Sequence, residues 1–175
     1  MTGQSSRAGP DERASCAAER AWAVLAEIAD PEIPVLSILD LGIVRRVEAS
    51  GPASIRVGLS PTYSGCPATS LIKASVVSAL RAEGFAEVTV EDVLSPPWSS
   101  DWITDEGRRK LREYGIAPPA QTVDSVKALF AAPIVQCPRC ASEATERISE
   151  FGSTPCKSLY RCTECREPFD YFKCI

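Results

Sequence analysis

Two Cys-x-x-Cys pairs lie near the end of the sequence and carry its clearest chemical signal. They are Cys137 with Cys140 and Cys162 with Cys165, separated by 21 residues. Each such turn directs two thiolates toward one point, and two turns supply the four ligands of a tetrahedral metal site. The chain contains no histidine, so this ligand set is all sulfur. The commonest general base is also missing, which argues against a cysteine nucleophile of the protease type.

The ligand spacing predicts a metal-folded ribbon over residues 134–175. Closed four-cysteine sites are commonly structural zinc sites, which fold modules too small to have a core of their own. Four thiolates also suit a single iron or an iron–sulfur cluster, so the residues alone leave the metal open. Cys156 and Cys174 exceed the four ligands. They could form a redox couple, act as alternative cluster ligands, or be small buried apolar residues, and the residues alone favour burial.

Cys66 is the most informative residue before the ribbon, because it stands between Gly65 and Pro67 at the start of a predicted helix. Backbone N–H groups and the helix dipole at such a place favour a thiolate that could hold or hand over a soft metal or an iron–sulfur cluster. The alternative is a cysteine packed in a tight turn. Acidic side chains in an earlier loop could assist a metal near Cys66, although caps and loop anchors are their commoner role; they are Asp30, Glu32 and Asp40.

The elements that position these residues can be predicted from hydrophobic periodicity. The first helix should bury one stripe with spacings of three and four residues, formed by Ala18, Trp22, Leu25 and Ile28. A turn at 50–52 joins two alternating segments into a hairpin. The predicted order is helix 11–29, strands 43–49 and 54–60, helix 67–82 and strand 88–93. This order predicts an α+β sandwich with the helices on one face of the sheet.

The remaining segments complete the predicted organisation. Thr104 suits a helix N-cap, and Gly115 suits the end of that helix. We therefore expect a disordered tail over 1–10, an α+β domain over 11–116, a linker over 117–133 and the ribbon over 134–175.

Bulk composition excludes several functional classes. The net charge of -4 argues against nucleic-acid binding, which usually requires a basic face. No apolar run reaches the roughly 18 residues that span a bilayer, and the start of the chain has no apolar signal segment. We therefore expect a cytoplasmic protein with no membrane partner, whose eight cysteines are reduced thiols and metal ligands. A disulfide scaffold is the alternative, but the residues before the ribbon can bury a core without staples.

Several stretches resemble the signature of a known family. Asp30-Pro-Glu-Ile-Pro-Val35, Leu39-Asp-Leu-Gly-Ile-Val44 and Ser60-Pro-Thr-Tyr-Ser-Gly-Cys-Pro-Ala-Thr69 are similar to the MIP18-like (DUF59) family, whose members act in iron–sulfur cluster assembly and transfer. Ser95-Pro-Pro-Trp98 and the ribbon, with its segments 151–156 and 169–174, narrow the resemblance to one subfamily. This subfamily comprises the D subunits of phenylacetyl-CoA epoxygenase systems, which belong to bacterial phenylacetate degradation.

The resemblance implies a MIP18-like sandwich followed by a zinc ribbon, and an accessory role. Such a protein would assemble or deliver an iron–sulfur or iron centre to the oxygenase or reductase subunits, with Cys66 as a transient ligand. The resemblance also weakens the interpretation of Cys156 and Cys174 as merely buried residues without a function. Because the chain has no nucleotide fingerprint, we expect it not to catalyse epoxidation itself. Two alternative functions stand beside this one. The chain could be an electron-transfer subunit with iron in the ribbon, or a zinc-ribbon binding module. Formation of a homodimer is left open.

Overall fold

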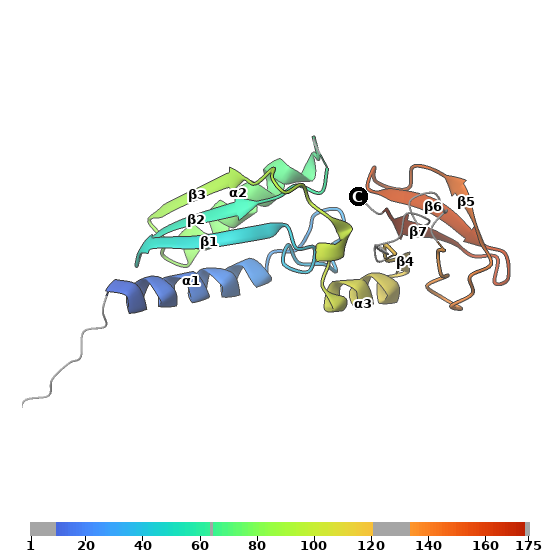
Figure 1. Ribbon diagram of the computed structural model, residues 1–175, viewed down its shortest axis with the longest axis horizontal. Coiled ribbons are helices and arrows are strands. Elements are labelled where there is room, and N and C mark those ends of the chain that lie inside the picture. The colour runs from blue at the N-terminus through green and yellow to red at the C-terminus, as the bar shows by residue number, and fades with distance from the viewer. Residues whose placement is uncertain (1–9, 64, 121–133, 174–175) are drawn as a thin grey trace, which may run out of the picture.

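The structure has two β-sheets that lie end to end, with α-helices packed beside them (Figure 1). This computed structural model describes residues 10–63, 65–120 and 134–173. Residues 1–9 of the predicted tail and Cys174 lie outside the described residues, whereas Pro10, the last residue of that predicted tail, begins the first helix. The elements are α1 (Pro10–Ala26), β1 (Val44–Gly51), β2 (Ser54–Leu59), α2 (Ala68–Ala82), β3 (Glu87–Asp92), the short 3-10 helix η1 (Ser100–Trp102), α3 (Asp105–Tyr114), β4 (Ile116–Ala117), β5 (Thr145–Ser149), β6 (Lys157–Cys162) and β7 (Pro168–Phe172).

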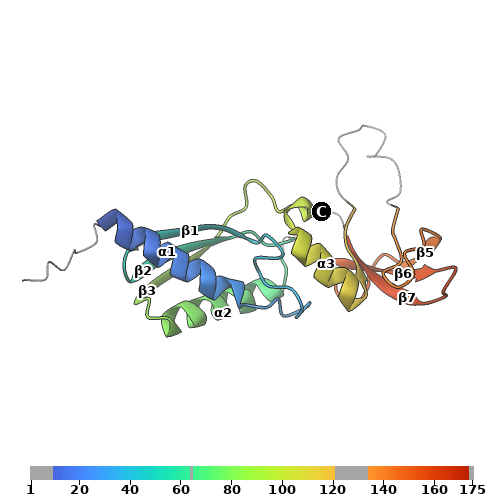
Figure 2. The same cartoon turned by 90° about the horizontal axis from the view of Figure 1, so that it is seen from below.

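The first sheet has the order β1-β2-β3. β1 and β2 pair antiparallel as a hairpin, and β2 and β3 pair parallel through the crossover helix α2. Both α1 and α2 cover one face of this sheet (Figure 2). The predicted order of helix, strand, strand, helix and strand is therefore confirmed, as is the α+β sandwich.

The buried face of α1 differs from the predicted stripe. Ala17, Ala21 and Leu25 are at most 2% exposed, whereas Trp22 is 38% exposed. Alanines at four-residue spacing let the helix backbone approach the sheet closely, and a tryptophan does not fit into that narrow space. Leu25 belongs to both faces, and Ile28, which lies just beyond the end of α1, packs partly buried against the core as predicted. Within the helix, however, the buried face is centred on Ala17 and Ala21 rather than on Ala18 and Trp22.

Helix α3 begins and ends as predicted. The Thr104 side chain accepts a hydrogen bond from the Gly107 amide at 3.0 Å, which satisfies one free N–H of the first turn. Gly115 ends the helix with φ of 89°, a left-handed conformation that glycine adopts at low cost. Helix α3 thus carries the chain from the first sheet to the second (Figure 2).

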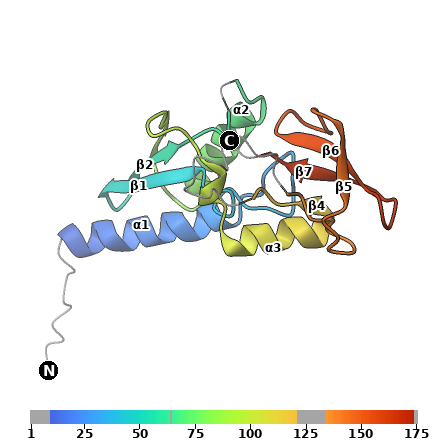
Figure 3. The ribbon, with the colours of Figure 1, turned by 45° about the vertical axis from the view of Figure 1, so that its right-hand side comes forward.

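The second sheet has the order β4-β7-β6-β5. Its strand β4 immediately follows α3 and pairs parallel with β7, so residues 116 and 117 join the ribbon's sheet (Figure 3). The expected boundary between domain and linker therefore falls within a strand. The larger part of the expected linker, residues 121–133, lies outside the described residues.

The hydrophobic core of the first domain extends onto the ribbon, which also buries a smaller cluster of its own around Tyr160 and Phe169. Phe172 at the end of β7 is 2% exposed, and its ring centroid lies 6.1 Å from that of Trp98. The Trp98 indole donates to the Leu41 carbonyl at 2.9 Å, which fixes its ring over the first domain. Cys156 belongs to the same cluster of buried residues. The ribbon is therefore packed against the first domain rather than tethered to it.

Candidate metal centre and inter-domain cleft

The four ribbon cysteines meet at one point. Their Sγ atoms all lie within 4.8 Å of one another, in the set Cys137, Cys140, Cys162 and Cys165. The Cys137–Cys165 sulfur pair is 3.7 Å apart, and the Cys140–Cys162 pair is 3.6 Å apart. A tetrahedron with metal–sulfur bonds of about 2.3 Å has edges of about 3.8 Å. The cysteines therefore fit a closed tetrahedral site, in which sulfur fills all four positions.

Both Cys-x-x-Cys turns have the same backbone geometry. The residue after the second cysteine is left-handed in each, with φ of 59° at Ala141 and 62° at Arg166. Non-glycine residues rarely adopt this conformation. In each turn the amide of the first cysteine donates to the carbonyl five residues later, from Cys137 to Ser142 at 2.9 Å and from Cys162 to Glu167 at 3.0 Å. This repeated geometry aims the thiolates of both turns at the same centre.

A second group of chemically active side chains lines a cleft between the first domain and the ribbon. The cleft is narrow, with a cavity volume of about 30 Å³. Three separate segments supply its polar lining, namely the loop between α1 and β1, the loop between β2 and α2 with the first turn of α2, and the loop before β6. The polar and sulfur-bearing residues are Asp30, Glu32, Ser60, Thr62, Cys66, Thr69 and Cys156. The structure therefore brings Cys66 together with two of the three predicted acidic residues and with Cys156.

Cys156 reaches the cleft from the ribbon. Its Sγ lies 3.0 Å from the Thr154 hydroxyl and 3.7 Å from Glu32 Oε2, to which the thiol donates. Burial raises the pKa of the Cys156 thiol, and the negative charge of Glu32 adds to this effect. Cys156 is thus a buried, protonated thiol beside a carboxylate, in addition to being part of the core.

Cys66 precedes α2 by two residues. Gly65 has φ of 84°, which turns the chain sharply before Cys66. The Cys66 amide donates to the Tyr63 carbonyl at 3.3 Å, and its carbonyl accepts from Thr69 at 3.1 Å. Among the residues that the structure describes, no side chain caps α2, and the first turn of this helix has no acidic residue. The positive end of the helix is therefore left for a negative group at or near Cys66.

Asp30 shapes the loop that carries Glu32. Its Oδ1 accepts from the amides of Glu32 at 2.9 Å and Ile33 at 2.7 Å. Burial raises the pKa of the Asp30 carboxyl, although these two hydrogen bonds and the charge of Lys157 oppose the shift. Asp30 is thus a loop anchor as well as part of the cleft wall.

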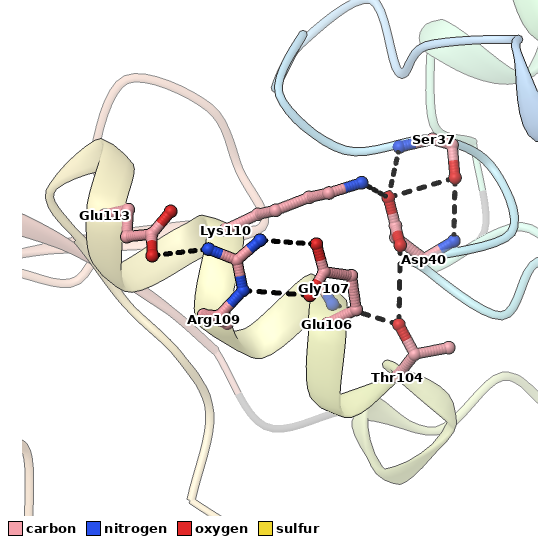
Figure 4. Close-up of polar contacts among 8 residues, drawn as sticks. All are labelled: Ser37, Asp40, Thr104, Glu106, Gly107, Arg109, Lys110 and Glu113. Carbon is pink, nitrogen blue, oxygen red and sulfur yellow. Dashed lines mark hydrogen bonds and ion pairs between the residues drawn. The ribbon is translucent and has the colours of Figure 1, made fainter.

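Asp40 lies in a different network and does not line the cleft. Its Oδ2 accepts from the Ser37 amide at 2.9 Å and from Lys110 Nζ at 2.7 Å (Figure 4). Burial alone would raise the pKa of Asp40, but the bonds from Lys110 and Ser37 outweigh it and lower that pKa. The Thr104 amide donates to the Asp40 carbonyl at 2.9 Å. Asp40 therefore ties the first loop to α3.

Three polar residues near the cleft were not singled out from the sequence. The Ser60 side chain is 1% exposed, and its hydroxyl has no hydrogen-bond partner among the described residues. Burial and the neighbouring Cys66 raise the pKa of Tyr63 to about 12. Lys157 follows Cys156, is 4% exposed and lies 3.7 Å from Asp170 Oδ2. Ser60 and Tyr63 belong to the 60–69 motif, which was the available signal for them.

Comparisons with known proteins agree with both halves of this arrangement. Residues 18–91 match the family model of an iron-sulfur cluster assembly protein, and residues 121–173 match that of the PaaD zinc beta ribbon domain. Over 154 residues the chain is 55% identical to the putative D subunit of the 1,2-phenylacetyl-CoA epoxidase of Escherichia coli K12, covering 88% of this chain and 91% of that protein. An "Fe-S protein maturation auxiliary factor" of Porphyromonas gingivalis is 28% identical over 89 residues, covering 50% of this chain and 84% of that protein.

The solved structures include a similar fold for the first domain. A crystal structure of a domain of unknown function, DUF59, from Bacillus anthracis matches with a TM-score of 0.54 and 25% identity. The match covers 58% of this chain and 96% of that one.

Among the described residues, no helix is long and apolar enough to cross a membrane.

Proposed function

Because the chain belongs to the family of 1,2-phenylacetyl-CoA epoxidase D subunits, we propose that it is an accessory protein of a phenylacetyl-CoA epoxygenase system. In this role it assembles or delivers an iron–sulfur or iron centre to the oxygenase or its reductase. The family likeness of residues 18–91 to iron-sulfur cluster assembly proteins supports the kind of cargo. The setting is the reducing cytoplasm, where its cysteines stay available as thiols.

The convergence of Cys66 and Glu32 on one cleft is the observation that carries this proposal. A thiolate and a carboxylate are both ligands that iron accepts. Binding of Fe²⁺ by Cys66 replaces an S–H bond with an S–Fe bond and releases one proton, and no oxidation is involved. Stronger ligands of a client protein then take the iron, and the thiol regains a proton. Asp30 holds the loop in the shape that presents Glu32.

The ribbon site has a separate, structural task, and zinc is its proposed metal. All four of its positions are filled by cysteine sulfurs, so it offers no open position for cargo or substrate. A closed site of this kind holds the ribbon's fold together. We also propose that the ribbon is the docking element for the oxygenase or reductase. An electron-transfer role would instead require a redox-active metal, such as iron, in these four positions.

A comparison of client proteins from two strains tests the proposed delivery. The reductase and the oxygenase are each purified without air from cells that carry the wild-type chain or the Cys66→Ser variant. The iron of both proteins and the acid-labile sulfide of the reductase are measured. We expect a large loss of iron from at least one of these two proteins in the variant strain. Cys16→Ser is the matched control, since Cys16 is an exposed thiol on α1. Full cluster occupancy of the reductase and the oxygenase's iron site in the Cys66→Ser strain would contradict the proposal.

A further inference from the structure

We propose that Cys156 of the ribbon is a second ligand for the metal cargo, so that the cleft is a two-thiol site completed across the contact between ribbon and first domain. The ligand class is a divalent metal that accepts sulfur and oxygen, such as Fe²⁺. This inference rests on the proposed function, because it assigns a further ligand to the same cargo site.

The position of Cys156 separates it from the ribbon's own metal site. Among the described residues, only Cys137, Cys140, Cys162 and Cys165 form a group within 4.8 Å. Cys156 instead faces the first domain, where its thiol donates to Glu32. It also lines the same cleft as Cys66. Two thiols and a carboxylate, drawn from three separate segments, therefore border one space.

A buried hydroxyl gives independent evidence for a polar guest in this space. Ser60 lines the cleft and is 1% exposed, yet its Oγ has no partner among the described residues. Buried polar groups nearly always have a partner, and an exception needs an explanation. A metal that carries water or sulfide into the cleft would supply a partner for this hydroxyl.

The charges around Cys156 also suit a metal. Two thiolates with Glu32 would place excess negative charge in a partly buried space, which is costly without compensation. The buried cation Lys157 adjoins this site, and its charge favours the ionised forms of both Asp30 and Cys156. Asp170 Oδ2 lies 3.7 Å from Lys157 Nζ, so Asp170 compensates part of the positive charge of Lys157. Lys157 is thus placed to offset charge on the cleft side of the ribbon.

The cleft ligands differ from the ribbon ligands in how far they are preassembled. The ribbon cysteines already stand at the separation of a tetrahedral site, whereas the cleft ligands do not form such a group. Binding Fe²⁺ must therefore draw Cys66 and Cys156 together, with release of two protons and formation of two S–Fe bonds. This rearrangement weakens affinity. A weaker site suits cargo that must leave, and a preassembled site suits a metal that stays.

An anaerobic titration of the zinc-loaded full chain with Fe²⁺ tests this assignment. Bound iron is measured by ultrafiltration, and Fe–thiolate bonds by their near-ultraviolet absorption. We expect the wild type and the Cys16→Ser control to bind one Fe²⁺ beyond zinc. Cys156→Ser should weaken this binding at least about tenfold and reduce the absorption, as should Cys66→Ser. Zinc content and thermal unfolding verify the fold of each variant, and Cys156→Ala replaces Cys156→Ser if the serine variant does not fold.

The outcomes separate this inference from the proposed function. If Cys66→Ser abolishes binding while Cys156→Ser and Cys156→Ala bind Fe²⁺ as the wild type does, Cys156 is not a ligand, but Cys66 keeps its proposed role. If the double variant Cys66→Ser/Cys156→Ser still binds Fe²⁺ with wild-type affinity, the iron is bound elsewhere and the two-thiol site is refuted. Absence of Fe²⁺ binding by the wild type would refute it as well. The assay of the reductase and the oxygenase from Cys66→Ser strains then decides the proposed function separately.

Discussion

The Cys156 thiol lies 3.7 Å from Glu32 Oε2, although the two residues are 124 positions apart. This contact joins the ribbon to the loop between α1 and β1. Because Cys156 and Phe172 belong to the hydrophobic core of the first domain, the ribbon also forms one wall of the cleft. The fold of the ribbon and the shape of the cleft are therefore coupled.

Removal of one ribbon ligand should unfold the ribbon and open the cleft. We expect Cys162→Ser to lose its zinc and the strand structure of β5, β6 and β7, because metal binding supplies the folding free energy of such modules. Zinc content and far-ultraviolet circular dichroism measure this, with Cys16→Ser as the control. Retention of one tightly bound zinc per chain in Cys162→Ser would show that the four cysteines do not form the site.

Loss of the Phe172 ring should loosen the contact between ribbon and first domain. Phe172 is 2% exposed and packs on Trp98. Truncation of a buried phenylalanine to alanine costs about 3–5 kcal/mol, so Phe172→Ala should lower the free energy of unfolding by about that amount. Phe172→Leu, which keeps most of the buried volume, should cost clearly less. Urea denaturation measures both variants, and an equal, small effect for the two would contradict the packing described.

The Asp40–Lys110 pair should make stability depend on pH in the acid range. The bonds from Lys110 and Ser37 outweigh burial and lower the pKa of Asp40 in the folded state. A lowered pKa contributes stability that is fully present above the unfolded value of about 3.9 and is lost as pH falls through the folded pKa. The expected loss for Asp40→Asn at pH 7 is about 1 kcal/mol, since Lys110 is 32% exposed and solvent screens the pair.

The difference in stability between wild type and Asp40→Asn should therefore shrink as the pH falls below about 4. Thermal or urea unfolding at several pH values measures it. Glu48→Gln, which changes an exposed carboxylate on β1, serves as the control and should show little effect. A difference that stays constant from pH 7 to pH 3 would show that the Asp40 charge is not what stabilises the loop.

Local patterns predicted most elements and all four ribbon ligands. Alternation, turn residues and caps act over a few residues, and the two Cys-x-x-Cys turns carry their geometry within themselves. The buried face of α1 was misplaced because the choice of Ala21 over Trp22 depends on how closely the sheet approaches. That distance is a tertiary property, which the helix sequence does not contain.

The cleft was predictable only in part for the same reason. Cys66 and Glu32 belong to recognisable motifs, so they could be proposed together. The approach of Cys156 requires the ribbon to pack on the first domain, and no local pattern indicates this packing. Asp40 was grouped with the transfer residues by its nearness in sequence, whereas its carboxylate pairs with Lys110, 70 positions later.

The metal and sulfide content of the chain, purified without air from cells that express the epoxygenase system, decides whether the cleft carries iron. We predict one zinc per chain together with iron in the wild type, and one zinc without iron in Cys66→Ser. Equal iron in both would contradict the assignment of the cargo to the cleft. A wild-type protein with one zinc, no iron and no sulfide would contradict it as well.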